Sequence, residues 1–410
     1  MKQFQVPSHF RSNLLSAVKQ YRKQGDKMKK DFSPTLIDLG TVRFYLARHF
    51  GFCYGVENAI EIAIRTIEEN PGKRIFLLSE MIHNPQVNAG LLERGVKFLQ
   101  DTYGNQLIPF DDLKEDDVVI IPAFGTTLET EKLLRDKGIA IEKYNTTCPF
   151  VEKVWNRGEQ IAAKGYTIVI HGKPAHEETR ATFSHAGANA PSVVVNDLKE
   201  AELLADFIRG IRSEEEFYTL FKGRHSVGFN PVKDLQRMGV INQTTQLASD
   251  TQEITDYLKQ TVKEYFSLNE ETLPQHFADT RDTLCYATND NQTAVKGLLE
   301  QKADLAIVVG GYNSSNTTHL VELCEKVLPT YFISGADQLL SSDEIIHFNF
   351  HDKKEYLSRD YLPQNKSVSI LITSGASCPD AMVEAVIEKI SMFCKTDVSL
   401  NEIAAKFNKE

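Results

Sequence analysis

Three cysteines, Cys53, Cys148 and Cys285, share a local sequence context that suits metal ligation. Each follows a short extended run that ends in small or polar residues, and an amphipathic helical pattern begins within a few positions. A thiol at such a junction lies near a helix N-terminus, where the helix dipole favours the thiolate that metals bind. Three thiolates at one centre would suit an iron–sulfur cluster, or a zinc ion with one open position. The alternative is that each cysteine is a small buried apolar side chain.

A candidate proton carrier lies in the stretch "HGKPAHEET", directly after an apolar strand pattern. This stretch contains His176, Glu177 and Glu178, and a buried carboxylic acid can carry protons when burial raises its pKa. The alternative is a capped helix start, because acidic residues favour the first helical turn. The stretch is not the HExxH motif of zinc proteases, since Arg180 stands in place of the second histidine.

Two further loops have the composition of an anion-binding site. In "GGYNSSNTTHL", Ser314, Ser315 and Asn316 offer hydroxyl, amide and backbone N–H donors where a helical pattern opens. In "TSGASCPD", Ser377 is the candidate donor. The alternative for both loops is an ordinary N-cap turn. Neither is a Walker phosphate loop, because no Gly-Lys-Ser/Thr follows.

The positions of these residues indicate a threefold repeat. After each cysteine and its helix come two apolar runs of strand length that end in polar residues or glycine. These pairs of runs are "RIFLLSE" and "DVVIIPAFGTT", "YTIVIHG" and "MGVINQTT", and "LAIVVGG" and "VSILITSGAS". Alternating strands and helices predict parallel βαβ units, whose ligands collect beyond the carboxyl ends of the strands. Two further residues become candidates for the same site because they follow such strands. They are His83, in "IHNPQVN", and Thr244, in "NQTT".

The fold class expected from this repeat is α/β, with three similar α/β domains in a pseudo-threefold, trefoil-like arrangement around a shared centre. The predicted parts are an N-terminal arm at 1–42, α/β domains at 43–145, 146–282 and 283–394, and a C-terminal tail at 395–410. The second domain is expected to carry a helical insertion from about Asp197 to Lys222.

The N-terminal arm differs from the rest of the chain in its charge. Residues 1–31 contain eight Lys or Arg against two acids, with Leu14, Leu15 and Val18 at helical spacing. This pattern favours a packed or frayed amphipathic arm. A transit peptide is the alternative, but acidic residues and the bias toward lysine argue against it.

The composition sets limits on the class of protein. A chain of 410 residues favours two or three domains, and its apolar runs have strand length, so no membrane span is expected. The net charge of -10 argues against nucleic acid as a partner, although a local pocket can still bind a small anion. Six scattered cysteines, without a CxxC pair or a secretory signal, indicate a reducing compartment.

Taken together, these motifs resemble the hydroxymethylbutenyl diphosphate reductase (LytB) family, which performs the last step of the non-mevalonate isoprenoid pathway. The matching stretches run in family order from Arg43 to about Lys389. They are "GFCYGVENAI", "IHNPQVN", "PAFG", "NTTCPFVEKVW", "HGKPAHEET", "NQTT", "LCYATNDNQTAV", "VVGGYNSSNTTHL" and "TSGASCPD". The length, "PAFG" and "HEET" look like the longer cyanobacterial and plastid branch of the family.

The resemblance implies a 4Fe–4S cluster held by Cys53, Cys148 and Cys285, with the fourth iron open to the substrate hydroxyl. It also implies two-electron removal of that hydroxyl from 4-hydroxy-3-methylbut-2-enyl diphosphate, with a donor such as ferredoxin or flavodoxin. The products would be isopentenyl and dimethylallyl diphosphates. By motif match, the diphosphate ligands would be His83, His176, Ser314, Ser315, Asn316 and Ser377. Glu178 would deliver protons, and Thr244 would order the hydroxyl and its water network.

One position departs from the family pattern: Phe124 stands where many relatives have a histidine, so one expected diphosphate donor is missing or replaced. Two rival functions remain open, a non-catalytic metal-containing sensor of a phosphorylated metabolite and a dehydratase that needs no reductant. The expected location is the cytoplasm, or the plastid stroma if the source is a photosynthetic eukaryote.

Overall fold

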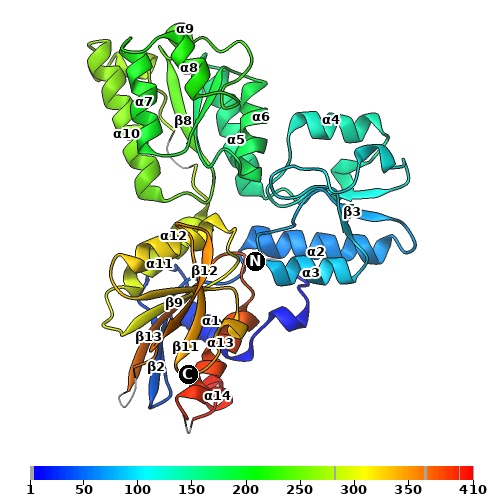
Figure 1. The fold of residues 1–410 in the computed structure, drawn as a ribbon, viewed down its shortest axis with the longest axis vertical. Helices are drawn as coiled ribbons and strands as arrows, with labels where there is room; N and C mark the ends of the chain where they lie inside the picture. Colours follow the sequence, from blue (N-terminus) through cyan, green and yellow to red (C-terminus); the bar gives the residue numbers. More distant parts are fainter. Residues whose placement is uncertain (1–3, 281–282, 364–366, 397, 410) are drawn as a thin grey trace. The chain divides into compact units, whose positions relative to one another are not determined.

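The structure, a computed structural model, describes residues 4–280, 283–363, 367–396 and 398–409. The chain has an α/β fold and divides into two compact units. Unit 1 comprises Met1–Glu57, His83–Gln86 and Tyr286–Glu410, and unit 2 comprises Asn58–Ile82 and Val87–Cys285. In the chain colouring of Figure 1, unit 1 therefore combines blue N-terminal elements with yellow to red C-terminal ones.

Unit 1 contains a mixed five-stranded sheet with the order β1-β2-β13-β9-β10. The strands are β1 (Thr35–Asp38), β2 (Val42–Leu46), β13 (Val368–Ser374), β9 (Leu305–Val309) and β10 (Thr330–Ile333). Strand β1 is antiparallel to β2, and all other neighbours are parallel. The central strands are nearly continuous apolar runs, as expected for strands with both faces covered.

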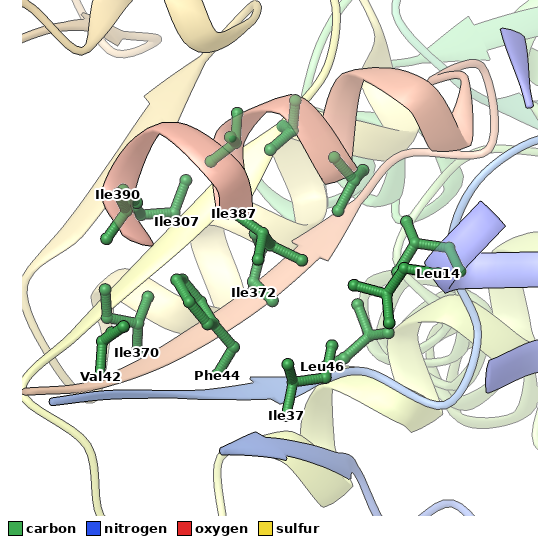
Figure 2. Close-up of a cluster of buried hydrophobic side chains, with 14 of the residues drawn as sticks. Leu14, Ile37, Val42, Phe44, Leu46, Ile307, Ile370, Ile372, Ile387 and Ile390 are labelled. Carbon is green, nitrogen blue, oxygen red and sulfur yellow. The ribbon is translucent and has the colours of Figure 1, made fainter. Parts of the chain in front are cut away.

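Helices cover both faces of this sheet. The helices of unit 1 are α1 (Asn13–Gly25), α11 (Tyr286–Leu298), α12 (Ser315–Glu325), α13 (Asp380–Phe393) and α14 (Leu400–Lys409). Figure 2 shows the core on one face, where Leu14 of α1 and Ile387 of α13 pack with Phe44 and Ile372 of the sheet. Helices α11 and α12 supply the apolar cluster on the other face. Each fully buried Leu, Ile or Phe side chain contributes about 1.5–3 kcal/mol relative to exposure.

Helices α1 and α14, near the two ends of the described chain, both belong to unit 1. Ser12 caps α1 by accepting a hydrogen bond from the backbone N–H of Leu15 at 2.9 Å, and the apolar face of α1 is buried. Residues 395–410, expected as a polar tail, contain the helix α14. Its buried residues Ile403 and Ala404 share one helix face, which explains why a segment rich in polar residues nevertheless packs.

Unit 1 also contains short accessory elements. These are the 3₁₀ segments η1 (Ser8–Phe10) and η5 (Ala336–Gln338), and the hairpin strands β11 (Glu344–Asn349) and β12 (Lys354–Arg359). The two hairpin strands pair antiparallel, separately from the five-stranded sheet.

Unit 2 contains two parallel three-stranded sheets. The first has the order β4-β3-β5, formed by β4 (Lys97–Phe98), β3 (Ile75–Leu77) and β5 (Val118–Ile120). The second has the order β7-β6-β8, formed by β7 (Ser192–Val195), β6 (Thr167–His171) and β8 (Met238–Asn242). All six apolar runs expected from the repeat therefore form strands.

The remaining helices follow the strand-and-helix alternation. They are α2 (Tyr54–Glu69), α3 (Pro85–Glu93), α4 (Leu128–Asp136), α5 (Pro149–Ala162), α6 (Glu177–Gly187), α7 (Leu198–Ile208), α8 (Glu214–Leu220), α9 (Pro231–Asp234) and α10 (Ala248–Tyr265). The 3₁₀ segments are η2 (Phe110–Asp112), η3 (Ile141–Tyr144) and η4 (Leu273–Gln275). Helices α7 and α8 lie within the range where an insertion was expected. Among the described residues, no helix is both long and apolar enough to cross a membrane.

One strand lies in a different sheet from the one that its sequence position suggests. Strand β2 falls at the start of the range 43–145, but it pairs in parallel with β13, with Phe44 opposite Ile370. Figure 1 shows the blue strand β2 beside β13. The division into three domains stays a prediction.

Candidate active site

In unit 1, three site loops follow the carboxyl ends of three adjacent parallel strands. Cys53 follows β2, Ser377 follows β13, and Ser314 follows β9, and these strands are neighbours in the order β2-β13-β9. Because parallel strands end at the same edge of a sheet, this topology gathers the three loops. The edge is the place where ligands of open α/β sheets bind.

Hydrogen bonds connect the cysteine loop to the two polar loops. The backbone N–H of Cys53 donates to the carbonyl of Ala376 at 3.2 Å. The N–H of Ala376 donates in turn to Oδ1 of Asn316 at 3.0 Å, and Nδ2 of Asn291 donates to the same oxygen at 3.4 Å. Asn316 thereby fixes the loop that positions Cys53.

His83 belongs to unit 1 and lies against both polar loops. The hydroxyl of Ser377 donates to the backbone carbonyl of His83 at 3.2 Å. On the other loop, a Cβ added to Gly311 would lie 2.4 Å from that carbonyl oxygen, so only glycine permits this approach. The structure thus brings together His83, Ser377 and the loop that leads to Ser314.

The loop after β9 opens helix α12 with a serine cap. Oγ of Ser314 accepts hydrogen bonds from the backbone N–H of Thr317 at 3.3 Å and from its hydroxyl at 3.0 Å. Ser314, Ser315 and Asn316 are all buried. The ordinary capping function is therefore present, and it places these side chains at a helix N-terminus, where backbone N–H groups and the helix dipole favour anions.

In unit 2, the carboxyl ends of β6 and β8 bring Glu178 and Thr244 into direct contact. Oε1 of Glu178 accepts from the backbone N–H of Thr244 at 2.5 Å, and Oε2 accepts from its hydroxyl at 2.9 Å. Glu178 is buried, with 1% of the residue exposed to solvent. His176 caps the same helix, with Nδ1 accepting from the backbone N–H of Glu178 at 3.1 Å. The acid, the hydroxyl and the histidine therefore form one cluster.

Gln243, next to Thr244, connects the loops around this cluster. Its Oε1 accepts from the backbone N–H of Lys173 at 3.1 Å, the hydroxyl of Thr179 at 3.0 Å and Nε2 of Gln246 at 3.1 Å. Gln243 has no exposed surface. The sequence prediction did not select this residue, although its place in "NQTT" was a signal that could have identified it.

Glu177 has a different partner from its neighbour. Its carboxylate accepts a hydrogen bond from the hydroxyl of Ser79, which lies just beyond the end of β3, and both residues are buried. The sequence left a choice between Glu177 and Glu178 as the acid. The contact with Thr244 favours Glu178, while Glu177 links helix α6 to the β3 sheet. Ser79 had no sequence signal of its own.

The aromatic residue in place of the family's histidine contacts a predicted diphosphate ligand. The ring of Phe124 packs edge-on against that of His176, with centroids 5.5 Å apart and planes at 86°. Phe124 thus supports the imidazole ring but offers no hydrogen-bond donor of its own.

Two of the three candidate metal ligands belong to unit 2. Cys148 is the N-cap residue of α5, and its N–H donates to the carbonyl of Ala123 at 2.9 Å. Cys285 is buried, directly precedes α11, and donates its N–H to the carbonyl of Thr244 at 3.4 Å. The Cys285 backbone is therefore tied to the loop that contacts Glu178.

The surroundings of Cys53 fit a thiolate ligand. Burial raises the pKa of the Cys53 thiol, whereas backbone N–H groups of Val56 and Gly55, in the first turn of α2, oppose that rise. A sulfur that accepts N–H hydrogen bonds is the usual arrangement for a cysteine bound to an iron–sulfur cluster.

All six cysteines lie in the described part of the chain, and none forms a disulfide. Their thiols are thus compatible with metal ligation. Among the described residues there is no group of three or more His, Cys, Asp or Glu side chains placed to hold a metal ion. The convergence of Cys53, Cys148 and Cys285 stays a prediction.

Comparison with known proteins gives consistent matches over most of the chain. The model of the family described as "LytB protein" matches residues 44–391. A 4-hydroxy-3-methylbut-2-enyl diphosphate reductase of Crocosphaera subtropica is 43% identical over 352 residues, which are 86% of this chain and 85% of the relative. The reductase of a Cyanothece species is 40% identical over 387 residues, 94% of this chain and 90% of the relative.

Solved structures give a similar result. A structure described as (E)-4-hydroxy-3-methyl-but-2-enyl diphosphate reductase, the terminal enzyme of the non-mevalonate pathway, matches with a TM-score of 0.52 and 26% identity. That match covers 85% of this chain and 99% of the other. A reductase structure from Plasmodium falciparum matches with a TM-score of 0.60 and 22% identity, over 85% of this chain and 87% of the other, and supports the fold alone.

Proposed function

The chain belongs to the LytB family, and on that premise we propose that it is a 4-hydroxy-3-methylbut-2-enyl diphosphate reductase. The reaction consumes two electrons and two protons, breaks the allylic C–O bond and releases water, giving isopentenyl or dimethylallyl diphosphate. The observation that carries the proposal is the buried contact between Glu178 and Thr244 at the carboxyl ends of β6 and β8.

Glu178 is the proposed proton donor. An alcohol is a poor leaving group unless it is protonated, so an acid must lie close to the hydroxyl that departs as water. The hydroxyl of Thr244, 2.9 Å from the Glu178 carboxyl, can accept a proton from the acid and donate its own to the substrate hydroxyl. Burial keeps bulk water away from this path, so Glu178 supplies the proton from a defined position.

The diphosphate is proposed to bind at the loops after β9 and β13. Ser314, Ser315 and Asn316 lie at the start of α12, where N–H groups and side-chain donors can surround phosphate oxygens. Ser377 and His83 lie beside that loop within the same unit. Neutral donors of this kind suit a protein with an overall charge of -10, because a cluster of lysines is not required.

His176 completes the proposed diphosphate ligands.

A 4Fe–4S cluster is proposed to be held by three cysteines, Cys53, Cys148 and Cys285. When bound, such a cluster supplies the electrons and an iron position open to the substrate hydroxyl. The residues present fit this group, since each cysteine lies where a helix begins.

The electron donor is proposed to be a small carrier protein of the ferredoxin or flavodoxin type. Reduced thiols and a reducing donor require a reducing compartment, for which we propose the cytoplasm, or the plastid stroma in a photosynthetic eukaryote. Neither nucleic acid nor a membrane is part of the proposed mechanism.

Replacing Glu178 with Gln tests the proton role. With reduced methyl viologen as donor, we expect turnover of the diphosphate substrate to fall by about 100-fold or more, since the amide cannot donate the proton. Glu177→Gln is the matched control, because it changes the adjacent carboxylate, which bonds to Ser79. Retained turnover in Glu178→Gln would contradict the assignment.

Two further outcomes separate the rival functions. Turnover of the substrate without any reductant would indicate a dehydratase, and substrate binding without turnover would indicate a sensor. Anaerobic iron and sulfide analysis tests the ligands independently of activity. We expect Cys148→Ser to lower the iron and sulfide content, while Cys394→Ser, outside the predicted ligand set, leaves both unchanged.

A further inference from the structure

The turn that follows helix α1 pairs its two acidic groups with arginines. The carboxylate of Asp26 accepts the backbone N–H of Lys30 at 3.1 Å and that of Asp31 at 3.0 Å, and it lies 3.7 Å from the Arg48 guanidinium. Asp31 pairs with Arg22 at 2.8 Å. Both acids of the turn are therefore paired with arginines, while Asp31 remains exposed.

Four lysines project from this region and are exposed. They are Lys23, Lys27, Lys29 and Lys30, and we call this group the basic turn. Because the Asp26 carboxylate holds the backbone of the turn by two hydrogen bonds, the lysine side chains extend from a fixed base. The result is a group of four exposed lysines on a chain whose net charge is -10, with Asp31 and Asp290 as the nearby acids.

A buried histidine lies near this turn. Burial, followed by the charges of Arg48 and Lys29, lowers the pKa of His49 to about 4. His49 and Arg48 lie on the segment that leads from β2 to Cys53. Of the basic turn, Lys29 therefore lies close enough to act on a residue of the segment that leads to Cys53.

The arm that carries the basic turn is packed against both neighbours of Cys53. The Phe10 ring lies 5.7 Å from that of Phe52, and the Phe4 ring lies 4.9 Å from that of Tyr54, both edge-on. Farther along the arm, Lys19 bonds to Asp380 at 2.8 Å and lies 4.5 Å from the Phe50 ring. These contacts fix the arm, and with it the basic turn, relative to the Cys53 loop.

We propose that the basic turn is the docking surface for a small acidic electron-carrier protein. This inference rests on the proposed function, which requires two electrons from outside the chain. A positive surface on an otherwise acidic protein attracts an acidic partner and turns it toward this face. Docking here brings the carrier to the loop of Cys53, a proposed cluster ligand and thus a point of electron entry.

A nucleic acid fits this surface less well. Phosphate polymers need an extended basic face, whereas the basic turn offers four lysines on a chain of net charge -10.

The test is the variant Lys23→Gln/Lys27→Gln/Lys29→Gln/Lys30→Gln, with a cyanobacterial plant-type ferredoxin as the probe. We expect ferredoxin binding at low ionic strength, measured by calorimetry, to weaken by about tenfold or more, with a smaller dependence on salt. The ferredoxin-driven kcat/KM should fall by a similar factor. Turnover with reduced methyl viologen, which needs no protein docking, should stay unchanged.

The matched control removes four exposed lysines from the same unit, Lys302, Lys326, Lys353 and Lys354. Of these, Lys302 and Lys326 precede β9 and β10, so they lie near the opposite, amino ends of the parallel strands. The control should bind ferredoxin like the parent.

Unchanged ferredoxin binding and turnover in the basic-turn variant would overturn the proposal, as would an equal loss in the control variant. Binding is measured separately from turnover. If the parent protein lacks viologen-driven activity, the proposed function fails, and the binding comparison still decides whether the basic turn docks the carrier.

Discussion

Glu178 and Thr244 are joined by two hydrogen bonds that use both oxygens of one carboxylate and both donors of one threonine. One partner follows β6 and the other follows β8, which are adjacent parallel strands. The pair therefore depends on the register of these strands, since a shift would separate the acid from its hydroxyl partner.

Replacing Thr244 with Val should lower kcat by about tenfold or more, because valine keeps the shape of threonine but removes the hydroxyl bonded to Glu178. KM should change little. Thr244→Ser, which retains the hydroxyl, should recover most of the rate. Steady-state kinetics with reduced methyl viologen measure the effect, and equal activity of the Val and Ser variants would contradict a role for the hydroxyl.

Gln243→Leu should lower both stability and kcat. Leucine leaves the N–H of Lys173 and the hydroxyl of Thr179 without the amide oxygen they bond to, at a cost of about 1–3 kcal/mol. The loops that hold Glu178 should become more mobile. We therefore expect kcat to fall by a larger factor than the factor by which KM changes. Gln243→Glu keeps an acceptor oxygen and should restore part of the rate.

Urea unfolding and steady-state kinetics measure these effects on Gln243. Gln236→Leu is the control, since Gln236 is exposed and precedes β8 rather than following it. A loss of stability without any loss of kcat in Gln243→Leu would limit Gln243 to a structural role.

Phe124→His should strengthen substrate binding. A histidine at this position restores a hydrogen-bond donor beside His176, and one such bond contributes about 1 kcal/mol, or roughly a fivefold lower KM. Phe124→Leu, which removes the edge-on ring contact without adding a donor, is the control and should not lower KM. An unchanged or higher KM for Phe124→His would show that the position does not reach the diphosphate.

Acid should destabilise the protein partly through His49. Burial and the nearby charges lower its pKa from 6.5 to about 4 in the folded state, so the unfolded chain takes up a proton that the folded chain does not. The free energy of unfolding should therefore fall as the pH decreases from 6.5 toward 4. The charged groups that act on His49 are Arg22, Asp26, Lys29 and Arg48.

His49→Phe should flatten this pH dependence, because phenylalanine cannot take up the proton in either state. Urea unfolding at about pH 7 and about pH 5 measures the change. His351→Phe is the control, since His351 is exposed. An identical pH dependence in the parent and in His49→Phe would contradict the assignment.

Local sequence patterns were sufficient to locate the six strands of the repeat. Each is a short apolar run bounded by polar residues or glycine, and burial on both faces of a parallel sheet demands such a run. The same patterns could not identify the partner of β2. Periodicity reports burial, whereas pairing with β13 depends on a contact between residues such as Phe44 and Ile370, far apart in the chain.

The candidate site was predicted in part for the same reason. Residues that follow a strand, such as Glu178 and Ser377, could be found from the chain alone. Ser79 could not, because its role arises from Glu177, 98 residues away. Gln243 lies in "NQTT" directly after a strand, but its bond to Thr179, 64 residues away, could not be read from the chain. Nor did the composition of residues 395–410 reveal helix α14, in which Ile403 and Ala404 are buried.

The bond between Gly51 and Ser374 spans 323 residues, and beside it the N–H of Cys53 bonds to Ala376. A ribosome therefore releases nearly the whole chain before the loop around this thiol can close. Strand β2 can pair with β13 only after most of the chain has been synthesised, so the loop around Cys53 closes late.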